Sequence, residues 1–452
     1  MRRLVIAGGT VVTRQGALRV DIAVERARIT AIAPDLPRDE AEVVDAAGLL
    51  VLPGVVDVHT HLRLEDDEHP RRFHQDTLAA ARGGTTTVLS FNNPGTGISP
   101  TASRSLLRGL DEFRRRTADR SAVDYGLCAV LTGQQDDPIG ELPRLIEAGV
   151  PTFKAFMVYD FRLPDDALEA ALRTAARHGG MLQLHCEAPE IIDPLVDAAI
   201  GRHRVAARYH AMTRPAQAEA IATRRAIDMA RRAEAPLYIV HLSSAEALDE
   251  VADAKSRGEP VHVETCPHYL TLTDALYGDP DESEVIKRVI SPPLRSQADV
   301  DALWVGVRDG IVDVIASDHV PDRIDTEKSL PAPPFPKISN GAPGIETLLS
   351  IVYSEGVAGR RIGLERMVEL LSGTPARLFG LPSKGAVEVG RDADLVLLDP
   401  AARRTIRQAD LSHTSDFTPY EGMPVVGAIR DVLVRGRRIG DAPGRFLERR
   451  LI

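Results

Sequence analysis

The chain has 452 residues, of which 44% are hydrophobic and 27% charged, values typical of a globular protein that can bury an extensive core. Its net charge of -10 and pI near 5.8 argue against nucleic acid or an acidic membrane surface as a partner. We expect no signal peptide and no membrane span, and the three cysteines fit a reducing compartment, so we predict a cytoplasmic protein.

Two kinds of pattern follow one another along the chain. Residues 1–52 contain short β-branched segments separated by turn residues, which predicts a small β structure. From residue 53, apolar runs alternate with helical stretches such as 165–178 and 216–233. Eight strand candidates end near His59, Phe91, Leu131, Met157, His185, His241, Thr265 and Ser317. Eight consecutive βα units predict an α/β fold with a (β/α)8 TIM barrel over residues 53–384.

The β pattern returns after residue 385, in the runs 393–399, 425–429 and 432–436. The simplest interpretation is that residues 1–52 and 385–452 together form one small β-sandwich domain beside the barrel. Within the barrel region, the proline-rich run 331–336 cannot continue a helix. We therefore expect a long loop there, over the mouth of the barrel.

His59 and His61 close the apolar run 49–56 and are one residue apart. Strand side chains alternate, so this spacing places two imidazoles on the same face of a strand. Such a pair suits zinc and similar divalent ions. Two polar residues on a solvated strand face would give the same spacing, but the position at the end of an apolar strand favours a metal site.

Other residues with metal-binding capacity follow later predicted strands, where a barrel gathers its chemistry. They are Lys154, His185, His241 and Asp318. Lys154 is unusual, because a buried ammonium is costly and has no lone pair for a metal. Reaction of its amine with CO2 would give a carbamate whose two oxygens can bridge two cations.

The whole pattern resembles the amidohydrolase superfamily, in its branch of hydantoinases, dihydropyrimidinases, allantoinases and dihydroorotases. The resemblance covers nearly the whole chain and includes the segments 83–87, 264–270, 291–295, 340–346 and 390–394. It implies two divalent metal ions, expected to be zinc, and a homodimer or homotetramer. The implied ligands are His59, His61 and Asp318 for one ion, His185 and His241 for the other, and carboxylated Lys154 as the bridge.

The activity that the resemblance implies is hydrolysis of a cyclic amide by a metal-bridging hydroxide. Asp318 would take the proton of the attacking water and pass it to the leaving nitrogen. Tyr159, five residues after Lys154, would hydrogen-bond the oxyanion, as in the hydantoinase and dihydropyrimidinase pattern. Ser291 and Asn340 match positions that hold the imide group of the substrate, mainly through backbone atoms.

Other features of the resemblance point to different rings. Arg63 and Asn93 resemble the dihydroorotase residues that bind a substrate carboxylate. The sequence segments 185–187 and 267–268 resemble the corresponding segments of allantoinase. Dihydroorotases have a histidine four residues after the catalytic aspartate, but here that position is Asp322, which would repel a carboxylate. Arg63 could instead pair with Asp322 or Glu187.

We therefore expect a neutral ring, of hydantoin or dihydropyrimidine type, as the substrate. Allantoinase and dihydroorotase activity are the alternatives. A non-catalytic adaptor related to dihydropyrimidinase is an alternative of another class, but an adaptor need not keep the four histidines, the lysine and the aspartate that this chain retains.

Overall fold

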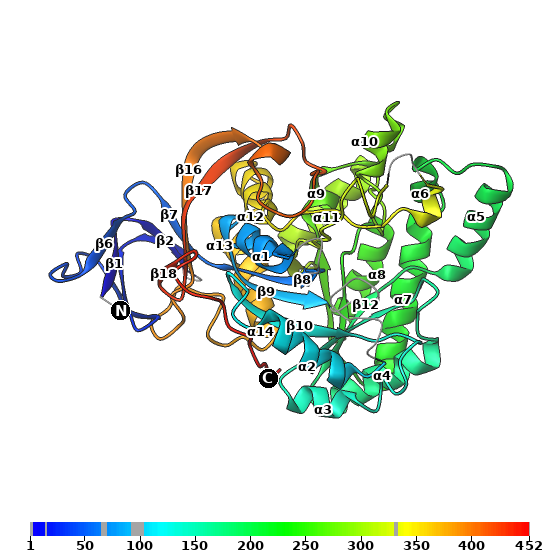
Figure 1. Cartoon of the computed structure of the whole chain (residues 1–452), viewed down its shortest axis with the longest axis horizontal. Helices are drawn as coiled ribbons and strands as arrows, with labels where there is room; N and C mark the ends of the chain where they lie inside the picture. The colour runs from blue at the N-terminus through cyan, green and yellow to red at the C-terminus, as the bar shows by residue number, and fades with distance from the viewer. Residues whose placement is uncertain (1–2, 14–15, 65–69, 92–103, 330–332, 452) are drawn as a thin grey trace.

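A parallel sheet of eight strands dominates the computed structural model, which describes residues 3–13, 16–64, 70–91, 104–329 and 333–451 (Figure 1). Neighbouring strands follow chain order, so each new strand is added beside the previous one. The strands are β8 (Val55–Thr60), β9 (Thr85–Phe91), β10 (Asp124–Val130), β11 (Thr152–Phe156), β12 (Met181–His185), β13 (Leu237–Ile239), β14 (Val261–Thr265) and β15 (Val314–Ile315).

The sheet closes into a ring next to its first strand. Thr60 forms a parallel bridge with His319, and the backbone N–H of His61 donates to the His319 carbonyl at 2.8 Å. Closure joins the two strand ends that carry His59 and Asp318, which are far apart in sequence. The predicted (β/α)8 TIM barrel is confirmed, and every predicted strand end lies within two residues of an observed one.

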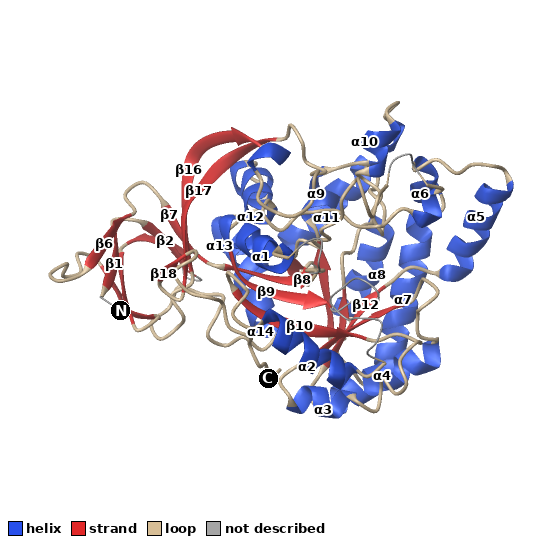
Figure 2. Ribbon diagram, viewed as in Figure 1, coloured by secondary structure: helices blue, strands red, loops and turns tan. Residues whose placement is uncertain are grey.

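Helices surround the barrel (Figure 2). The α-helices are α1 (Arg72–Arg82), α2 (Leu106–Thr117), α3 (Leu142–Glu147), α4 (Asp165–Arg177), α5 (Pro189–Gly201), α6 (Arg208–Met212), α7 (Ala216–Ala233), α8 (Ala245–Ser256), α9 (Pro267–Thr271), α10 (Glu282–Ile286), α11 (Gln297–Asp309), α12 (Leu348–Ile351), α13 (Leu364–Val368) and α14 (Thr374–Leu378). Shorter turns of 3-10 type are η1 (Asp274–Gly278), η2 (Phe335–Lys337) and η5 (Gln408–Asp410), and π-helical turns are η3 (Val352–Ala358) and η4 (Glu369–Gly373).

Local sequence explains several of these boundaries. Ser296 and Asp299 form a capping box at the start of α11, which ends at Gly310 in the left-handed conformation, with φ of 86°. The predicted helices at 165–178 and 216–233 correspond to α4 and α7. The expected loop at 331–336, of which residues 331 and 332 lie outside the described residues, is wrong in part, because η2 begins at Phe335. Pro336 is accommodated there, since the first N–H groups of a helical turn need no partner within it.

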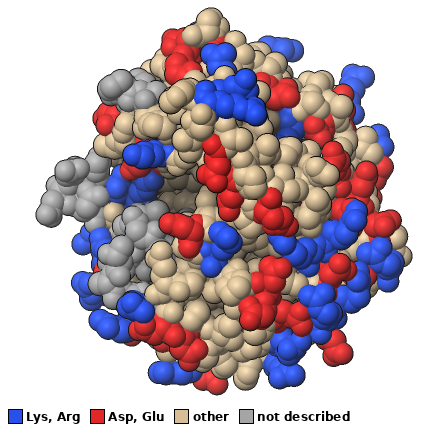
Figure 3. Space-filling view, turned by 90° about the vertical axis from the view of Figure 1, so that its right-hand side faces the viewer, with Lys and Arg blue, Asp and Glu red and all other residues tan. Residues whose placement is uncertain are grey.

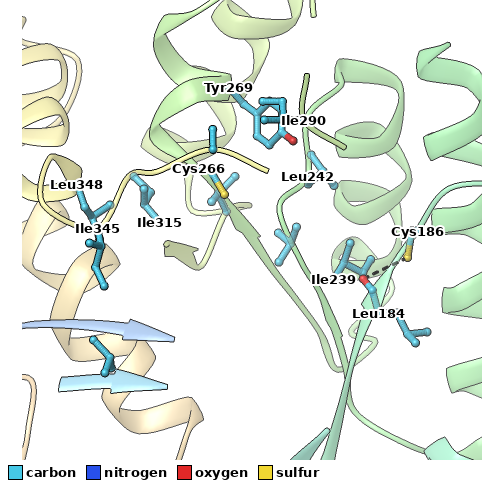
Figure 4. Packing of buried hydrophobic residues seen from close by; sticks show 14 of the residues in the cluster. Leu184, Cys186, Ile239, Leu242, Cys266, Tyr269, Ile290, Ile315, Ile345 and Leu348 are labelled. Atoms are coloured by element: carbon cyan, nitrogen blue, oxygen red, sulfur yellow. Dashed lines mark hydrogen bonds between the residues drawn. The ribbon is translucent and has the colours of Figure 1, made fainter. Parts of the chain in front are cut away.

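The core lies between the strands and the surrounding helices, where Figure 4 shows Leu184 of β12 near Ile239 of β13. Cys186 points the same way, and its thiol donates to the Leu184 carbonyl at 3.6 Å. Side chains of one strand alternate between two faces, so β12 packs Leu184 outward while His185 faces the inside of the barrel. Each fully buried leucine of this kind stabilises the fold by roughly 1.5–3 kcal/mol.

Two further sheets stand beside the barrel and combine strands from the N-terminal and C-terminal parts of the chain (Figure 1). One has the order β5-β4-β1-β6, with β5 (Arg28–Ala33), β4 (Asp21–Glu25), β1 (Leu4–Ala7) and β6 (Glu42–Asp45). The other has the order β18-β17-β16-β7-β2-β3, with β18 (Arg437–Arg438), β17 (Pro424–Val434), β16 (Leu395–Thr405), β7 (Leu50–Pro53), β2 (Thr10–Thr13) and β3 (Gly16–Arg19).

Pairing of β7 with β16 joins the beginning and the end of the chain in one sheet. Leu50 lies opposite Leu398, and Leu52 opposite Val396. An apolar cluster that includes Ile6, Val51 and Leu395 fills the space between the two sheets. The small β-sandwich built from both termini is thus present, while its boundaries at residues 52 and 385 stay a prediction.

The last described residues return to the N-terminal end of the barrel strands. Phe446 forms a parallel β-bridge with Tyr125, and only 1% of the Arg449 surface is exposed. The Arg449 guanidinium donates to the Leu127 carbonyl at 2.5 Å and to the Thr152 hydroxyl at 2.9 Å. This arginine therefore closes the end of the barrel opposite the mouth. Among the described residues, no helix has the length and apolar character that a membrane crossing requires.

Candidate metal centre

A cavity of about 250 Å³ opens at the C-terminal ends of the barrel strands. Figure 3 looks onto the side of the molecule toward which β8 and β9 point in Figure 1, and it shows this face hollowed, with acidic and basic side chains around it. Nine of the eleven predicted site residues line the cavity, namely His61, Arg63, Lys154, Tyr159, His185, His241, Ser291, Asp318 and Asn340. Of the other two, His59 is buried behind Asp318, and Asn93 lies outside the described residues.

His59, His241 and Asp318 form one group of potential metal ligands at this cavity. One ligand atom from each lies within 4.8 Å of the other two. Nε2 of His59 is 2.9 Å from Oδ1 of Asp318, and Nε2 of His61 is 3.3 Å from the same oxygen. The strand-end histidines of β8 and the aspartate after β15 are therefore brought together as the sequence predicts.

Glu264, at the end of β14, determines how the His59 ring is oriented. Its carboxylate accepts hydrogen bonds from Nδ1 of His59, from the Tyr238 hydroxyl at 2.7 Å and from the His241 backbone N–H at 3.2 Å. With Nδ1 occupied in this way, Nε2 of His59 faces Asp318. Glu264 is not among the site residues predicted from the sequence, although its position at the end of the seventh barrel strand is a signal that marks it as a candidate.

The other two histidines lie beside this group. The ring centroids of His185 and His241 are 4.6 Å apart, and those of His59 and His241 are 5.4 Å apart. Nε2 of His185 contacts the Glu187 carboxylate at 2.6 Å, and Arg214 pairs with the same carboxylate at 2.5 Å. Glu187 and Arg214, which the sequence analysis did not assign to the site, thus fix the orientation of His185.

Lys154 lies among the histidines and between two aromatic rings. Its Nζ is 5.0 Å from the Phe91 centroid and 5.2 Å from the Phe156 centroid. Burial lowers the pKa of Lys154 to about 8, against the opposing attraction of Asp318 and Glu264. The amine is therefore far easier to deprotonate than an exposed lysine.

The protonation states of His241 and of Asp318 favour the binding of a cation. Burial, together with the charge of Lys154, lowers the pKa of His241 well below its usual value, so this imidazole is neutral and keeps a lone pair. Burial would raise the pKa of Asp318, but the His59 imidazole and hydrogen bonds from His59 and His61 hold it well below its usual value. Within the described part of the chain, the buried Nδ1 of His61 has no hydrogen-bond partner. An anionic oxygen and free imidazole nitrogens fit a divalent ion.

The backbone is strained at three of the predicted site residues. Tyr159, His241 and Asp318 have φ values of 79°, 40° and 48°. Side chains other than glycine rarely adopt this left-handed region, at a cost on the order of 1–3 kcal/mol each. Strain of this kind is retained where the surrounding structure needs a side chain at one particular position.

The substrate side of the cavity is formed by Tyr159, Ser291 and Asn340. Burial raises the pKa of the Tyr159 hydroxyl, and hydrogen bonds with the side chains of Ser291 and Asn340 act in the opposite direction. The Arg214 guanidinium lies 5.4 Å from the centroid of the Tyr159 ring. These contacts bring together the three residues that the sequence analysis assigned to the oxyanion and the imide group.

Arg63 is already paired within the protein. Its Nη2 is 2.5 Å from Oδ1 of Asp322, and its Nη1 contacts the carboxylate of Glu327 and donates to the Pro321 carbonyl at 3.2 Å. Of the two carboxylates suggested from the sequence, Asp322 pairs with Arg63, whereas Glu187 pairs with Arg214. The guanidinium is thus neutralised before any substrate arrives.

Comparison with known proteins is consistent with this geometry. The model of the Amidohydrolase family matches residues 50–439. The chain is 37% identical to D-phenylhydantoinase of Escherichia coli O1:K1 / APEC over 469 residues, which cover 99% of this chain and 98% of that protein. It is 38% identical to D-hydantoinase of Ralstonia pickettii over 460 residues, 99% of each. The crystal structure of dihydropyrimidinase from Brevibacillus agri NCHU1002 has a TM-score of 0.93 at 35% identity, covering 100% of this chain and 99% of that one.

Proposed function

Because the chain belongs to the amidohydrolase family, we propose that it opens the ring of hydantoin or of a dihydropyrimidine by metal-assisted hydrolysis. One observation carries the proposal. The histidine, lysine and aspartate side chains at the strand ends share one cavity with Tyr159, Ser291 and Asn340. A cluster of cation ligands therefore faces groups that can hold an amide.

We propose that the centre holds two divalent ions, with zinc as the expected metal. His59, His61 and Asp318 would hold one ion, and His185 and His241 the other. Carboxylated Lys154 would lie between them, and its lowered pKa supports this because only the neutral amine reacts with CO2. Two such ions supply a water nucleophile that is active at neutral pH and electrophilic stabilisation of the substrate carbonyl.

Each protein group then has a defined task. Asp318 is a carboxylate at neutral pH and can accept a proton from the attacking water at its oxygen, then deliver it to the ring nitrogen that leaves. The Tyr159 hydroxyl would donate a hydrogen bond to the oxygen on which charge develops. Ser291 and Asn340 would hold the imide edge of the ring. We also propose a cytoplasmic location and a homodimer or homotetramer, the latter on family resemblance alone.

The pairing of Arg63 with Asp322 supports a substrate without a carboxylate. An incoming carboxylate would compete with two internal carboxylates for one guanidinium and would be repelled by both. Allantoin, another neutral ureide, is the second candidate. It is favoured by the allantoinase-like segment that places His268 and Cys266 within 4.8 Å of Asp318.

A hydrolysis panel of hydantoin, dihydrouracil, allantoin and dihydroorotate with zinc-loaded protein tests the proposal. We expect a neutral ring to be hydrolysed at least about tenfold better than dihydroorotate in kcat/KM, which corresponds to about 1.4 kcal/mol of transition-state discrimination. If dihydroorotate is the best substrate, the assignment is wrong. A folded sample that binds no metal would favour the non-catalytic adaptor.

A further inference from the structure

Lys328 is a fully buried lysine that the proposed chemistry does not use. Its exposure is 0%, and among the described residues it has no ion pair with a carboxylate. A lysine ammonium has three N–H donors and is costly to bury without partners. Two backbone carbonyls take this role, those of Val289 at 2.9 Å and Ser339 at 2.8 Å, and Nζ lies 5.7 Å from the centroid of the Phe417 ring.

The two carbonyls belong to separate segments that both form walls of the cavity. Val289 precedes Ser291 by two residues, and Ser339 is adjacent to Asn340. Ser291, Ser339 and Asn340 all line the cavity. The side chain of Lys328 is therefore a direct link between the two segments that would hold the imide edge of the ring.

Other contacts hold the two segments beside this link. His210 contacts the Ile290 carbonyl at 2.9 Å and the Ser291 hydroxyl at 3.2 Å, which also holds the first segment. The backbone N–H of Ser339 donates to the Glu327 carbonyl at 3.2 Å, next to Lys328 itself. Lys328 thus joins two segments that are also held by other hydrogen bonds.

We propose that Lys328 is a positioning residue, which sets the spacing of the Ser291 and Asn340 segments and thereby the affinity for the cyclic substrate. The inference rests on the proposed function, because it assigns the ring to these two segments. Its contribution is expected in binding rather than in the chemical step, because in the described part of the chain the Lys328 side chain contacts Val289, Ser339 and Phe417 and none of the predicted metal ligands. Removal of an interaction made equally in the ground state and the transition state raises KM and leaves kcat nearly unchanged.

The test compares Lys328→Met with wild type, both zinc-loaded. Met fills similar space but leaves both carbonyls without a donor. We expect KM for hydantoin to rise about tenfold or more, kcat to change less than about threefold, and zinc content to stay at the wild-type level. Hydrogen exchange should become faster in peptides that cover residues 286–294 and 336–344. Lys328→Arg, which keeps the charge and the donors, should recover at least part of the affinity.

A matched control is available in Lys255→Met. Lys255 also donates to a backbone carbonyl, that of Ile311 at 2.6 Å, but pairs with Asp313 and is not among the residues that line the cavity. This variant should keep the wild-type KM. If Lys328→Met does not fold, Lys328→Gln, whose shorter side chain cannot reach both carbonyls, replaces it, with an expected rise in KM of about threefold or more.

Wild-type KM and unchanged exchange in the two peptides would overturn the inference. A parallel loss of kcat and zinc would also overturn it, because it would place the effect at the metal centre. Failure of the proposed function has a different signature, which is absence of hydrolysis of every cyclic amide by the zinc-loaded wild-type protein. The exchange measurement still tests the link made by Lys328 in that case.

Discussion

Replacement of Glu264 by Gln tests whether this buried carboxylate holds the metal site in shape. Glu264 offers two oxygens to three donors, the His59 ring, the Tyr238 hydroxyl and the His241 backbone N–H. Gln has nearly the same shape but keeps one acceptor oxygen and turns the other into a donor. His59 then loses the charged acceptor that directs its Nε2 toward Asp318. Groups that orient a metal ligand typically contribute 10- to 100-fold to metal affinity, so we expect zinc binding to weaken by about 1.4–2.8 kcal/mol.

The assay is a competition titration of metal-free Glu264→Gln protein with zinc and a chelating dye, alongside circular dichroism to check the fold. Glu259→Gln is a matched control, because Glu259 precedes β14 at the other end of the barrel and pairs with Arg231 and Arg257 on the surface. The control should bind zinc like wild type. Wild-type zinc affinity in Glu264→Gln would refute the reasoning that Glu264 orients His59.

Three other predictions concern single residues. Lys154→Ala should lose metal and activity together while the fold survives. The mass of the wild-type protein, measured under non-denaturing conditions, should show an added carboxylate on Lys154. An unmodified lysine in an active enzyme with both metal ions bound would contradict this. Asp318→Asn should keep much of its metal and lose kcat by about 10²–10⁴, the usual contribution of a positioned acid–base, and near wild-type kcat would remove Asp318 from the proton path. Burial raises the pKa of Glu187, but Arg214 and His185 hold it at about 2, below its ordinary value of 4.5. This depressed pKa contributes stability above pH 4.5 that is lost as pH falls toward about 2. Glu187→Gln should therefore lose less stability than wild type as the pH is lowered. An equal loss of stability with falling pH in both proteins would argue against the pairing.

The sequence was sufficient for features that depend on local pattern. His185 ends an apolar run and its alternation with Leu184 is fixed by the strand, so its position at the barrel mouth follows from the residues themselves. For Arg63 the sequence left two carboxylate partners open, Asp322 and Glu187, and the structure pairs it with Asp322. The contact of Arg63 with Glu327 was not predicted, since it depends on the path of the loop after β15.

Other features depend on contacts between distant segments, which a pattern of single residues does not reveal. Lys328 lies in a region that the sequence marks only as a loop, and its two acceptors are backbone carbonyls that have no sequence signature. The strand-end position of Glu264 is visible in the sequence, but nothing local shows that its carboxylate faces the His59 ring. The position of Asn93 relative to the site stays a prediction.

The position of Arg449, which closes the end of the barrel opposite the mouth, has a consequence for synthesis of the chain. Arg449 follows Thr152, one of its hydrogen-bond partners, by 297 residues. A ribosome that adds about 5–20 residues per second needs roughly 15–60 s to cover that distance. Throughout this time the strands β10 and β11 are complete, but the side chain that fills the space beneath them does not yet exist. The nascent barrel therefore lacks this arginine until residue 449 has been synthesised, and in the meantime it relies on the outer helices made before that point to keep its apolar strands covered.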